Sequence, residues 1–562
     1  MNAPIPGQGR PLTVQGDHTI LAEVHAEGFA EARDMLSRFA ELEKSPEHVH
    51  TYRVTPLSIW NAAAAGMAAG EIIEFLTRAS RYDVPPNVER HIEENIRRFG
   101  LLRLTRRDGR LVLVSAEDAL LQRIARDVTL KKYFAAPSPE GDALPVLEEV
   151  RGEVKQALIR IGYPVEDLAG YTSGAELTFG LRETTLGGQP FALRPYQAEA
   201  GEIFHAGGTE KGGSGVVVLP CGAGKTVVGM ACMHRLQTQV LVLTTNTIAV
   251  RQWRTELLDK TTLSEEEVGE YTGDLKQVRP VTISTYQMLT YRRRKDGEFT
   301  HFSLFGARDW GLVIYDEVHL LPAPVFRITA EIQARRRLGL TATLVREDER
   351  EDEVFSLIGP KKYDVPWKIL ERQGWIASAH CVEVRLPLEG DRSFEYMSAG
   401  SRDRFRIASE NVDKVGLVRK LVASHAEDQV LIIGQYLDQL DLLAQELGCP
   451  LITGRTPTKE REDLYARFRD GRLHVLMVSK VGNFAVDLPD ANVAIQVSGT
   501  FGSRQEEAQR LGRILRPKAD RRPAVFYSLV TRDSREEHFA NNRQLFLTEQ
   551  GYTYEIRDVS EV

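Results

Sequence analysis

The sequence predicts an α/β protein with two parallel-sheet domains, which are preceded by α+β domains at the N-terminal end. First, apolar, strand-like runs alternate with helical segments from about residue 190 onward, a pattern typical of parallel sheets with helices on both faces. Second, this alternation occurs twice, with a break near residue 370. Third, residues 20–130 are mostly helical and contain one alternating hairpin. We therefore expect four domains along the chain.

Length and composition are those of a globular protein with several domains. At 562 residues the chain is too long for a single core. Its 42% hydrophobic and 27% charged residues argue against wholesale disorder. The net charge of −7 does not indicate nucleic-acid binding, although a local basic groove remains compatible with it. The four cysteines form no C-x-x-C pair, which argues against a zinc ribbon or a disulfide scaffold.

Neither a signal core nor a run of eighteen apolar residues occurs in the sequence. A secretory signal needs the first feature and a membrane-spanning helix needs the second. We therefore expect a cytoplasmic, nucleoid-associated protein with no membrane segment.

Residues 1–137 are expected to form the first α+β domain. Helical spacing in "SIWNAAAAGMAAGEIIEFLTRAS" and "PNVERHIEENIRRFG" precedes the hairpin "LLRLTRRDGRLVLVS", whose turn is Asp108-Gly109. Two helices followed by a basic hairpin have the order of a winged-helix unit, but an ordinary α+β domain with a solvated turn explains the pattern equally well. The basic residues near the hairpin tip are Arg106, Arg107 and Arg110.

A Pro/Gly/Ser stretch at residues 137–145 is the first convincing linker. We expect a small domain at 138–185, followed by the two sheet domains at 186–375 and 376–562. The strand-like runs of the first sheet domain are "GVVVLP", "QVLVLTT", "VTISTY" and "GLVIYDEVH". Those of the second are "QVLIIGQY", "LHVLMVS", "NVAIQVSG" and "AVFYSLV".

The stretch "VVVLPCGAGKTVVG" places a glycine-rich loop between a buried strand and the start of a helix. In such a loop backbone N–H groups converge on phosphate oxygens, Lys225 reaches the β- and γ-phosphates, and Thr226 holds Mg²⁺. The strict G-x-x-x-x-G-K-[ST] form is not met, because Leu219 stands where the first glycine belongs. We favour a nucleotide site over a coincidental glycine-rich turn. Its predicted residues are Pro220, Cys221, Gly222, Ala223, Gly224, Lys225 and Thr226.

Two adjacent carboxylates, Asp316 and Glu317, end the strand-like run "GLVIYDEVH". Ligands of open α/β sheets bind at the carboxyl ends of the strands. We expect Asp316 to hold the metal ion through water and Glu317 to polarise the attacking water. Such a pair is often only a solvated strand end, but about 90 residues after a Lys-Thr loop it predicts ATP hydrolysis. His319 is either a core histidine or a sensor of the nucleotide.

The stretch "QEEAQRLGRILRPK" carries Arg510, Arg513 and Arg516 at three-residue spacing, which places them on one side of a helix. An amphipathic basic helix is one interpretation. The other is that the second sheet domain offers arginine fingers to the γ-phosphate, a contribution worth about 10³ to 10⁵ in rate. In that case hydrolysis depends on closure of the two domains.

These stretches occur together with "LRPYQ", "TTNTIAVRQW", "ISTYQML" and "TAT", and the set is similar to superfamily 2 helicases. More narrowly, the chain resembles the xeroderma pigmentosum group B (XPB) family of DNA repair helicases. That resemblance rests on "GLTATLVRED", "ITGRTPTKERE", "SKVGNFAVDLPDANVAIQVSG", "GSRQEEAQRLGRILRPK" and "FYSLVTRDSREEHFANNRQLFLTEQGYTYEI". It covers about residues 190–562 and implies RecA-like folds for both sheet domains. The order of the N-terminal domains is similar to that of bacterial and archaeal relatives, with a damage-recognition-like domain at 138–185.

The resemblance implies roles for further residues. An Arg-Glu-Asp element for DNA unwinding corresponds to Arg346, Glu347 and Asp348, whereas the charges at 349–353 are read as a solvated helix start. A thumb-like insertion corresponds to residues 389–411. Its Arg402, Arg404 and Arg406 either meet phosphate or belong to a surface hairpin. Where the family often has Gly-Asp, this chain has Gly482-Asn483, which puts an inter-domain contact in doubt.

The same resemblance places Gln197, with Arg194 nearby, at the adenine. It also implies stretches that contact a DNA strand through its backbone, without sequence preference. The residues named for these stretches are Asn246, Gln252, Trp253, Ser284 and Thr285.

The sequence thus predicts a motor that hydrolyses ATP with Mg²⁺ and moves along single-stranded and duplex DNA, with 3′ to 5′ polarity and a repair role implied by the resemblance. A nuclease or a transcription or repair factor is the implied protein partner. One rival is an RNA-directed helicase, against which the Arg-Glu-Asp element and "FLTEQGYTYEI" count. The other is an ATP-gated clamp that regulates a partner complex, against which Glu317 and the arginine fingers argue.

Overall fold

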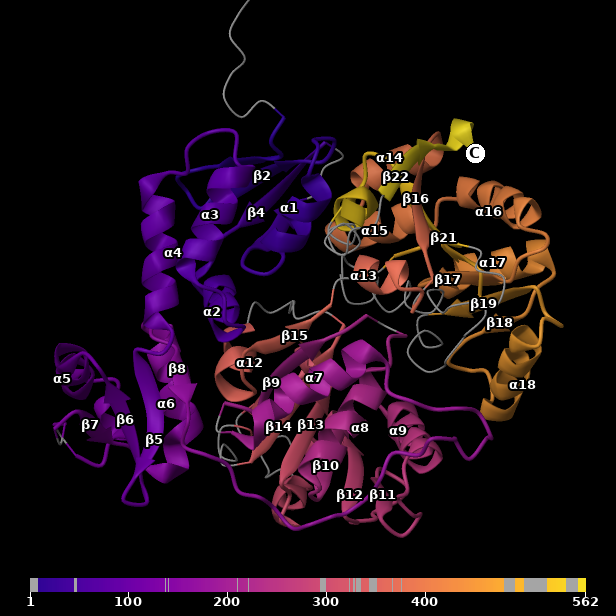
Figure 1. Cartoon of the computed structure of the whole chain (residues 1–562). Coiled ribbons are helices and arrows are strands. Elements are labelled where there is room, and N and C mark those ends of the chain that lie inside the picture. Colours follow the sequence, from indigo (N-terminus) through magenta and orange to yellow (C-terminus); the bar gives the residue numbers. More distant parts are fainter. Residues whose placement is uncertain are drawn as a thin grey trace, which may run out of the picture. The chain divides into compact units, whose positions relative to one another are not determined.

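The computed structural model describes residues 9–562 except 45–47, 137, 140, 210, 221, 294–299, 323, 327–328, 330–334, 343–350, 366, 376, 480–490, 500–522 and 542–553. The chain divides into two compact units (Figure 1). Unit 1 comprises residues 1–41, 51–219 and 224–364, and unit 2 comprises 42–50, 220–223 and 365–562. In the described part of the chain, no helix has the length and apolar character needed to cross a membrane.

The N-terminal region contains a four-stranded sheet with the order β1-β2-β4-β3. The strands are β1 (Leu12–Val14), β2 (Thr19–Glu23), β3 (Glu41–Lys44) and β4 (Val49–Arg53). The helices are α1 (Phe29–Leu36), α2 (Pro56–Ala64), α3 (Ala69–Ala79) and α4 (Pro86–Arg98). Helix α2 begins where it does because the Thr55 hydroxyl accepts from the Ser58 N–H and Pro56 occupies the first helical position.

A second four-stranded sheet has the order β7-β6-β5-β8. It comprises β5 (Leu102–Arg107), β6 (Arg110–Ser115), β7 (Ala143–Pro145) and β8 (Val165–Asp167), with helices α5 (Asp118–Arg126) and α6 (Arg151–Arg160). The predicted hairpin is confirmed, and its turn residues Asp108 and Gly109 have φ angles of 50° and 77°, as a two-residue hairpin turn requires.

The hairpin arginines are engaged by acidic side chains. The Arg106 guanidinium lies 2.7 Å from Glu148, and that of Arg107 lies 2.5 Å from Asp142. A single hydrophobic core joins this hairpin to β7, α6 and the residues up to Ala169. The four-domain division stays a prediction. Strands β6 and β7 pair with each other although they lie on opposite sides of the predicted boundary at residue 137.

Unit 1 also contains a seven-stranded parallel sheet with the order β11-β12-β10-β13-β14-β9-β15. Its central strands are buried on both faces, which explains their uninterrupted apolar sequences. The strands are β9 (Ser214–Val218), β10 (Val240–Thr244), β11 (Val268–Tyr271), β12 (Val281–Thr285), β13 (Leu312–Asp316), β14 (Arg336–Thr341) and β15 (Lys361–Asp364). The helices are α7 (Pro195–His205), α8 (Lys225–Leu236), α9 (Thr247–Lys260), α10 (Tyr286–Leu289) and α12 (Glu351–Leu357).

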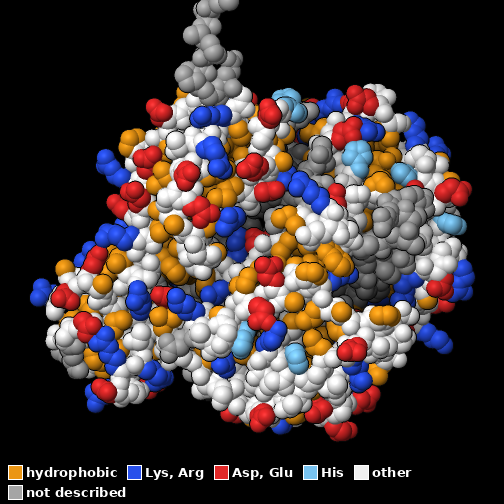
Figure 2. Space-filling model, viewed as in Figure 1, with side chains coloured by type: hydrophobic (Ala, Val, Ile, Leu, Met, Phe, Trp, Pro, Cys, Tyr) orange, Lys and Arg blue, Asp and Glu red, His pale blue; other side chains and the backbone are white. Residues whose placement is uncertain are grey.

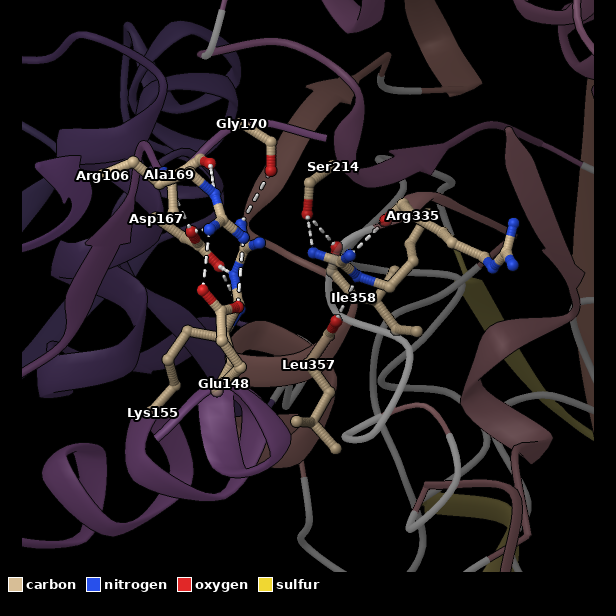
Figure 3. A network of polar contacts seen from close by, with 12 residues as sticks. Arg106, Glu148, Lys155, Asp167, Ala169, Gly170, Ser214, Arg335, Leu357 and Ile358 are labelled. Atoms are coloured by element: carbon tan, nitrogen blue, oxygen red, sulfur yellow. Dashed lines mark hydrogen bonds and ion pairs between the residues drawn. The ribbon is translucent and has the colours of Figure 1, made fainter. Parts of the chain in front are cut away.

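Buried charges lie where the β5–β8 region meets the seven-stranded sheet of unit 1 (Figure 3). Asp167 accepts hydrogen bonds from Arg151 at 2.7 and 3.1 Å and from Lys155 at 2.9 Å. Arg337 donates to the Leu357 carbonyl at 2.7 Å and to the Ser214 hydroxyl at 3.0 Å. The Tyr171 ring lies within 6 Å of both the Arg151 and the Arg337 guanidinium carbons. We call these residues the interface cluster.

Unit 2 is built on a second seven-stranded parallel sheet with the order β18-β19-β17-β20-β21-β16-β22. The strands are β16 (Ala379–Leu386), β17 (Val430–Gly434), β18 (Leu451–Ile452), β19 (Val475–Ser479), β20 (Val493–Gln496), β21 (Ala524–Thr531) and β22 (Tyr554–Asp558). The helices are α13 (Trp367–Arg372), α14 (Asp391–Ser398), α15 (Ser401–Ser409), α16 (Asp413–Ser424), α17 (Leu437–Leu447) and α18 (Thr458–Arg469). The two sheets confirm the predicted pair of parallel-sheet domains.

The insertion at 389–411 folds as a helical pair, α14 and α15. Arg404 donates to the carbonyls of Met397 and Ala399, and Arg406 pairs with Glu410 and Asp438 at 2.8 Å. Both guanidinium groups are therefore held by the chain itself. The side chain of Arg402 lies outside the described residues.

Positive and negative side chains are interspersed on the face shown in Figure 2. This distribution agrees with the small net charge of −7. The surface thus offers no single-sign field over the described part of this face.

Candidate nucleotide site

The glycine-rich loop connects β9 to α8, as the sequence predicts. Gly222 and Gly224 both have φ angles of 81°, a conformation that favours glycine. Gly224 precedes the first residue of α8, and a Cβ atom there would lie 2.6 Å from Nε2 of Gln197. Glycine is therefore favoured at 224 for its backbone angle, and the Gln197 side chain lies close against it. The loop ends at a helix N-terminus, which favours a bound anion.

Lys225 and Glu317 meet at the carboxyl edge of the unit 1 sheet. Strand β13 ends at Asp316, and Glu317 follows with a φ angle of 52°, which is uncommon for a residue other than glycine. The Lys225 ammonium lies 3.1 Å from Oε1 of Glu317, and both side chains are largely buried. The structure thus brings together the lysine and the carboxylates that the sequence placed about 90 residues apart.

The two carboxylates have pKa values shifted in opposite directions. Burial and the neighbouring Glu317 charge raise the pKa of Asp316. Burial also raises the pKa of Glu317, but the Lys225 ammonium, together with His319 and the Ala342 N–H, outweighs burial, so the net pKa of Glu317 is lowered. Two carboxylates thus share one ammonium, and a bound cation would stabilise the ionised form of both.

The residues present fit Mg²⁺ held jointly with a nucleotide. Oε2 of Glu317 is buried and accepts no hydrogen bond from the described residues. The half-buried Thr226 lies in the first turn of α8. Nucleotide-bound Mg²⁺ takes one or two protein ligands and completes its shell with phosphate and water. The described residues contain no group of three or more His, Cys, Asp or Glu arranged to hold a metal ion.

His319 links Glu317 to Thr341, the last residue of β14. Its Nδ1 lies 2.6 Å from Oγ1 of Thr341 and 3.5 Å from Oε2 of Glu317. The N–H of Leu219, which precedes the loop, donates to the Thr341 carbonyl at 2.9 Å. A continuous set of polar contacts therefore connects the Glu317 carboxylate, Thr341 and Leu219, the residue between β9 and the loop.

Gln197 and Arg194 lie at the start of α7, beside Gly224. The Arg194 N–H donates to Oε1 of Gln197 at 3.0 Å, and the Arg194 guanidinium donates to the Tyr196 hydroxyl at 3.0 Å. Gln197 is 3% exposed. The structure thus places this pair next to the loop, and contact with an adenine ring stays a prediction.

Four of the five side chains assigned to DNA contact are buried or make contacts within the protein, and DNA contact by their stretches stays a prediction. Asn246 accepts from the Ala249 N–H and caps α9, and Thr285 accepts from the Met288 N–H and caps α10. Ser284 is fully buried and donates to the Tyr271 carbonyl. Trp253 is 1% exposed, so its side chain does not face a DNA strand. Because these side chains are turned inward or used for capping, only the exposed Gln252 offers its side chain freely to solvent.

Sequence reasoning missed what Trp253 does. Its indole N–H donates to Oδ2 of Asp316 at 2.8 Å. The signal that could have revealed this packing is Gly229 in the middle of α8, where glycine is unfavourable. A Cβ atom at Gly229 would lie 2.5 Å from the Trp253 ring.

Several predicted residues lie outside the described residues, and their assignments stay predictions. They are Cys221, Arg346, Glu347, Asp348, Gly482, Asn483, Arg510, Arg513 and Arg516.

Comparison with known protein families covers most of the chain. Residues 370–561 match the ERCC3/RAD25/XPB C-terminal helicase family. Residues 190–346 match the type III restriction enzyme res subunit family, and residues 12–136 match a helicase conserved C-terminal domain family.

Relatives match over nearly the full length. The chain is 53% identical to a protein of Mycobacterium tuberculosis named DNA 3'-5' helicase XPB, with 98% of both chains covered. It is 52% identical to the protein of the same name from Kineococcus radiotolerans, covering 98% of this chain and 97% of that one. A putative DNA 3'-5' helicase Rad25 of Halobacterium salinarum is 36% identical over 94% of this chain and 84% of its own. The chain therefore belongs to the XPB helicase family, in its bacterial form.

Proposed function

We propose that this protein is an ATP-dependent DNA helicase and translocase that moves 3′ to 5′ and acts in DNA repair. The observation that carries the proposal is the Lys225–Glu317 pair, placed beside the glycine loop at the carboxyl edge of a parallel sheet. The names of the relatives support DNA as the substrate and 3′ to 5′ as the direction. The rival RNA-directed and clamp functions have no comparable support.

In this proposal each residue of the site has one task. The α8 N-terminus and Lys225 bind the phosphates, and Thr226 and Asp316 hold Mg²⁺. Glu317 orients the attacking water, since its carboxylate is ionised and buried beside Lys225. Bound Mg-ATP supplies a phosphoryl group whose transfer is aided by neutralising its charge. Arg510, Arg513 and Arg516 would contribute further positive charge from the second sheet domain.

The stretches that contain Gln252 and Ser284 are still proposed to contact DNA, but mainly through the protein backbone and not through their buried side chains. Because Trp253, Ser284 and Thr285 are buried, the stretches that contain them would contact the strand through backbone N–H groups and the Gln252 side chain. Arg346, Glu347 and Asp348 are proposed to act in strand opening. A cytoplasmic location and a nuclease or repair factor as partner belong to the proposal. A relative named as a subunit of general transcription and DNA repair factor IIH supports such a partner.

Strand displacement on matched substrates tests the proposal. A labelled duplex with a 3′ single-stranded tail, the same duplex with a 5′ tail, and the all-RNA version of each are compared in Mg-ATP. We expect displacement of the 3′-tailed DNA and ATPase stimulation by DNA but not by RNA. Displacement of the RNA duplex at an equal rate, or ATP hydrolysis that is indifferent to DNA, would refute it.

A further inference from the structure

The buried indole of Trp253 makes a contact that simple packing does not require. Trp253 lies on α9, is 1% exposed, and donates from Nε1 to Oδ2 of Asp316 at 2.8 Å. A buried indole N–H needs an acceptor, and a backbone carbonyl would serve. Here the acceptor is a carboxylate at the end of β13, which makes the hydrogen bond charge-assisted and stronger than a neutral one.

The position of the ring is fixed from the other side as well. Gly229 of α8 leaves room for the ring, since a Cβ atom there would lie 2.5 Å from Cη2 of Trp253 and 3.4 Å from the Leu340 side chain. The indole is thus held between the helix that follows the phosphate loop and the carboxylate. A small displacement of α8 toward the ring would therefore press on Trp253 and on its hydrogen bond with Asp316.

From this geometry we propose that Trp253 is a positioning residue for Asp316. Its N–H holds one carboxylate oxygen and leaves the other oriented for Mg²⁺. Residues that hydrogen-bond a metal-binding side chain fix its orientation, and their loss typically lowers metal affinity or activity about 10- to 100-fold. This inference rests on the proposed Mg-ATP hydrolysis and assigns a residue to it.

The inference also connects the site to α9. Arg251 and Gln252 are exposed on this helix, directly before the buried Trp253. A strand that binds the exposed residues therefore contacts the same helix that holds Asp316. A shift of α9 on DNA binding would move the Asp316 carboxylate through its hydrogen bond with Trp253.

The experiment compares Trp253→Phe with Trp310→Phe in the full-length protein. Trp310 is the matched control, because it is also fully buried in unit 1 but donates its indole N–H to the Leu304 carbonyl at 3.0 Å. Two quantities are measured: the Mg²⁺ concentration for half-maximal ATPase at saturating ATP, and the affinity for a fluorescent ADP analogue with Mg²⁺ and with EDTA. Trp253→Phe should raise the required Mg²⁺ about 10-fold and reduce the Mg²⁺-dependent gain in affinity. Binding in EDTA should stay within twofold, and Trp310→Phe should change neither quantity.

A second variant guards against loss of folding. Site-specific replacement of Trp253 by benzothienylalanine keeps the bicyclic ring and exchanges only the N–H for sulfur, and it should reproduce the altered Mg²⁺ dependence. An unchanged Mg²⁺ dependence in this variant would reduce Trp253 to a packing residue and overturn the inference. Failure of the proposed function would look different, because the wild-type protein would then show no Mg²⁺-dependent ATPase.

Discussion

Asp316 and Asp167 are both partly buried aspartates at the last residue of a parallel strand, yet their surroundings differ in kind. Asp167 lies among three buried cations, Arg151, Lys155 and Arg337, and two of them hydrogen-bond it. Asp316 lies beside a second carboxylate and shares one ammonium with it. The pKa of Asp167 is lowered although burial opposes this, because Lys155 and Arg151 outweigh it, whereas the pKa of Asp316 is raised.

The difference separates a structural cluster from a reactive one. In the interface cluster every oxygen of Asp167 has a protein donor, so its charge is balanced within the β5–β8 region by Arg151 and Lys155. In the nucleotide site the negative charge exceeds the positive charge and Oε2 of Glu317 accepts no hydrogen bond from the described residues. An imbalance of this kind is costly unless a ligand completes it, and such groups gather at functional sites.

The largest expected effect is on chemistry. Glu317→Gln keeps the shape of the side chain but cannot orient water as a base, so we expect kcat to fall about 10²- to 10⁴-fold with nucleotide still bound. Because the Glu317 charge raises the pKa of Asp316, that pKa should fall in the variant, and thermal stability should not suffer. DNA-stimulated turnover and binding of a fluorescent ATP analogue are measured together. Near wild-type turnover would remove Glu317 from the reactive cluster.

For Asp167→Asn we expect a loss of stability, whereas for Glu317→Gln we expect a loss of turnover. Removing this charge leaves Arg151 and Lys155 buried without their anion, which should lower the free energy of unfolding by about 3 to 5 kcal/mol. Hydrogen exchange in α6 and β8, followed by mass spectrometry, reports this loss locally. The control is Asp142→Asn, the same chemical change in an exposed pair with Arg107, and it should leave exchange unaltered. If Asp167→Asn lowers kcat of the folded protein while exchange stays the same, the two clusters are not distinct in function.

A smaller effect concerns pH. Burial lowers the pKa of Lys155 from its ordinary value of 10.5 to about 8, even though Asp167 opposes this shift. Between pH 8 and pH 10.5 the unfolded chain therefore binds more protons here than the folded one, so this group's contribution to stability rises with pH, by up to about 3 kcal/mol. Below pH 8 the full cost of burying the charge is present.

The comparison of wild type with Lys155→Met isolates this contribution. Both unfolding temperatures are measured by calorimetry from pH 7 to pH 10. Above pH 8 the unfolding temperature of the wild type should rise relative to that of Lys155→Met. A difference that does not vary with pH would mean that Lys155 keeps an ordinary pKa.

The smallest effect is expected for His319→Ala. This variant breaks the 2.6 Å contact between His319 and Thr341, and a neutral hydrogen bond contributes about 0.5 to 1.5 kcal/mol. If the contact holds Glu317 in place, kcat should fall about 5-fold while affinity for the ATP analogue changes less. A drop in thermal stability with unchanged kcat would show that His319 is a core histidine, which is the first of the two interpretations of the sequence.

Strands with continuous apolar sequence could be predicted from the sequence, and strand β14, which begins with two arginines, could not. The runs that became β9, β10, β12 and β13 are apolar because the sheet buries both their faces. Strand β14 was missed, because it begins with Arg336-Arg337. Arg337 is acceptable there because it donates hydrogen bonds to the Leu357 carbonyl and the Ser214 hydroxyl, which are distant in sequence, and to the Arg335 carbonyl.

The sequence by itself determined the α/β class, the phosphate loop with Lys225, and the carboxylates at the end of β13. These features depend on local spacing and on the order of strand and helix, which are written along the chain. Tertiary structure decided which side chains face ligand and which face protein. Trp253 is the clearest example: its place in a stretch implied to contact DNA says nothing about Asp316, 63 residues away, because a hydrogen bond between distant segments depends on how α8, α9 and β13 pack together.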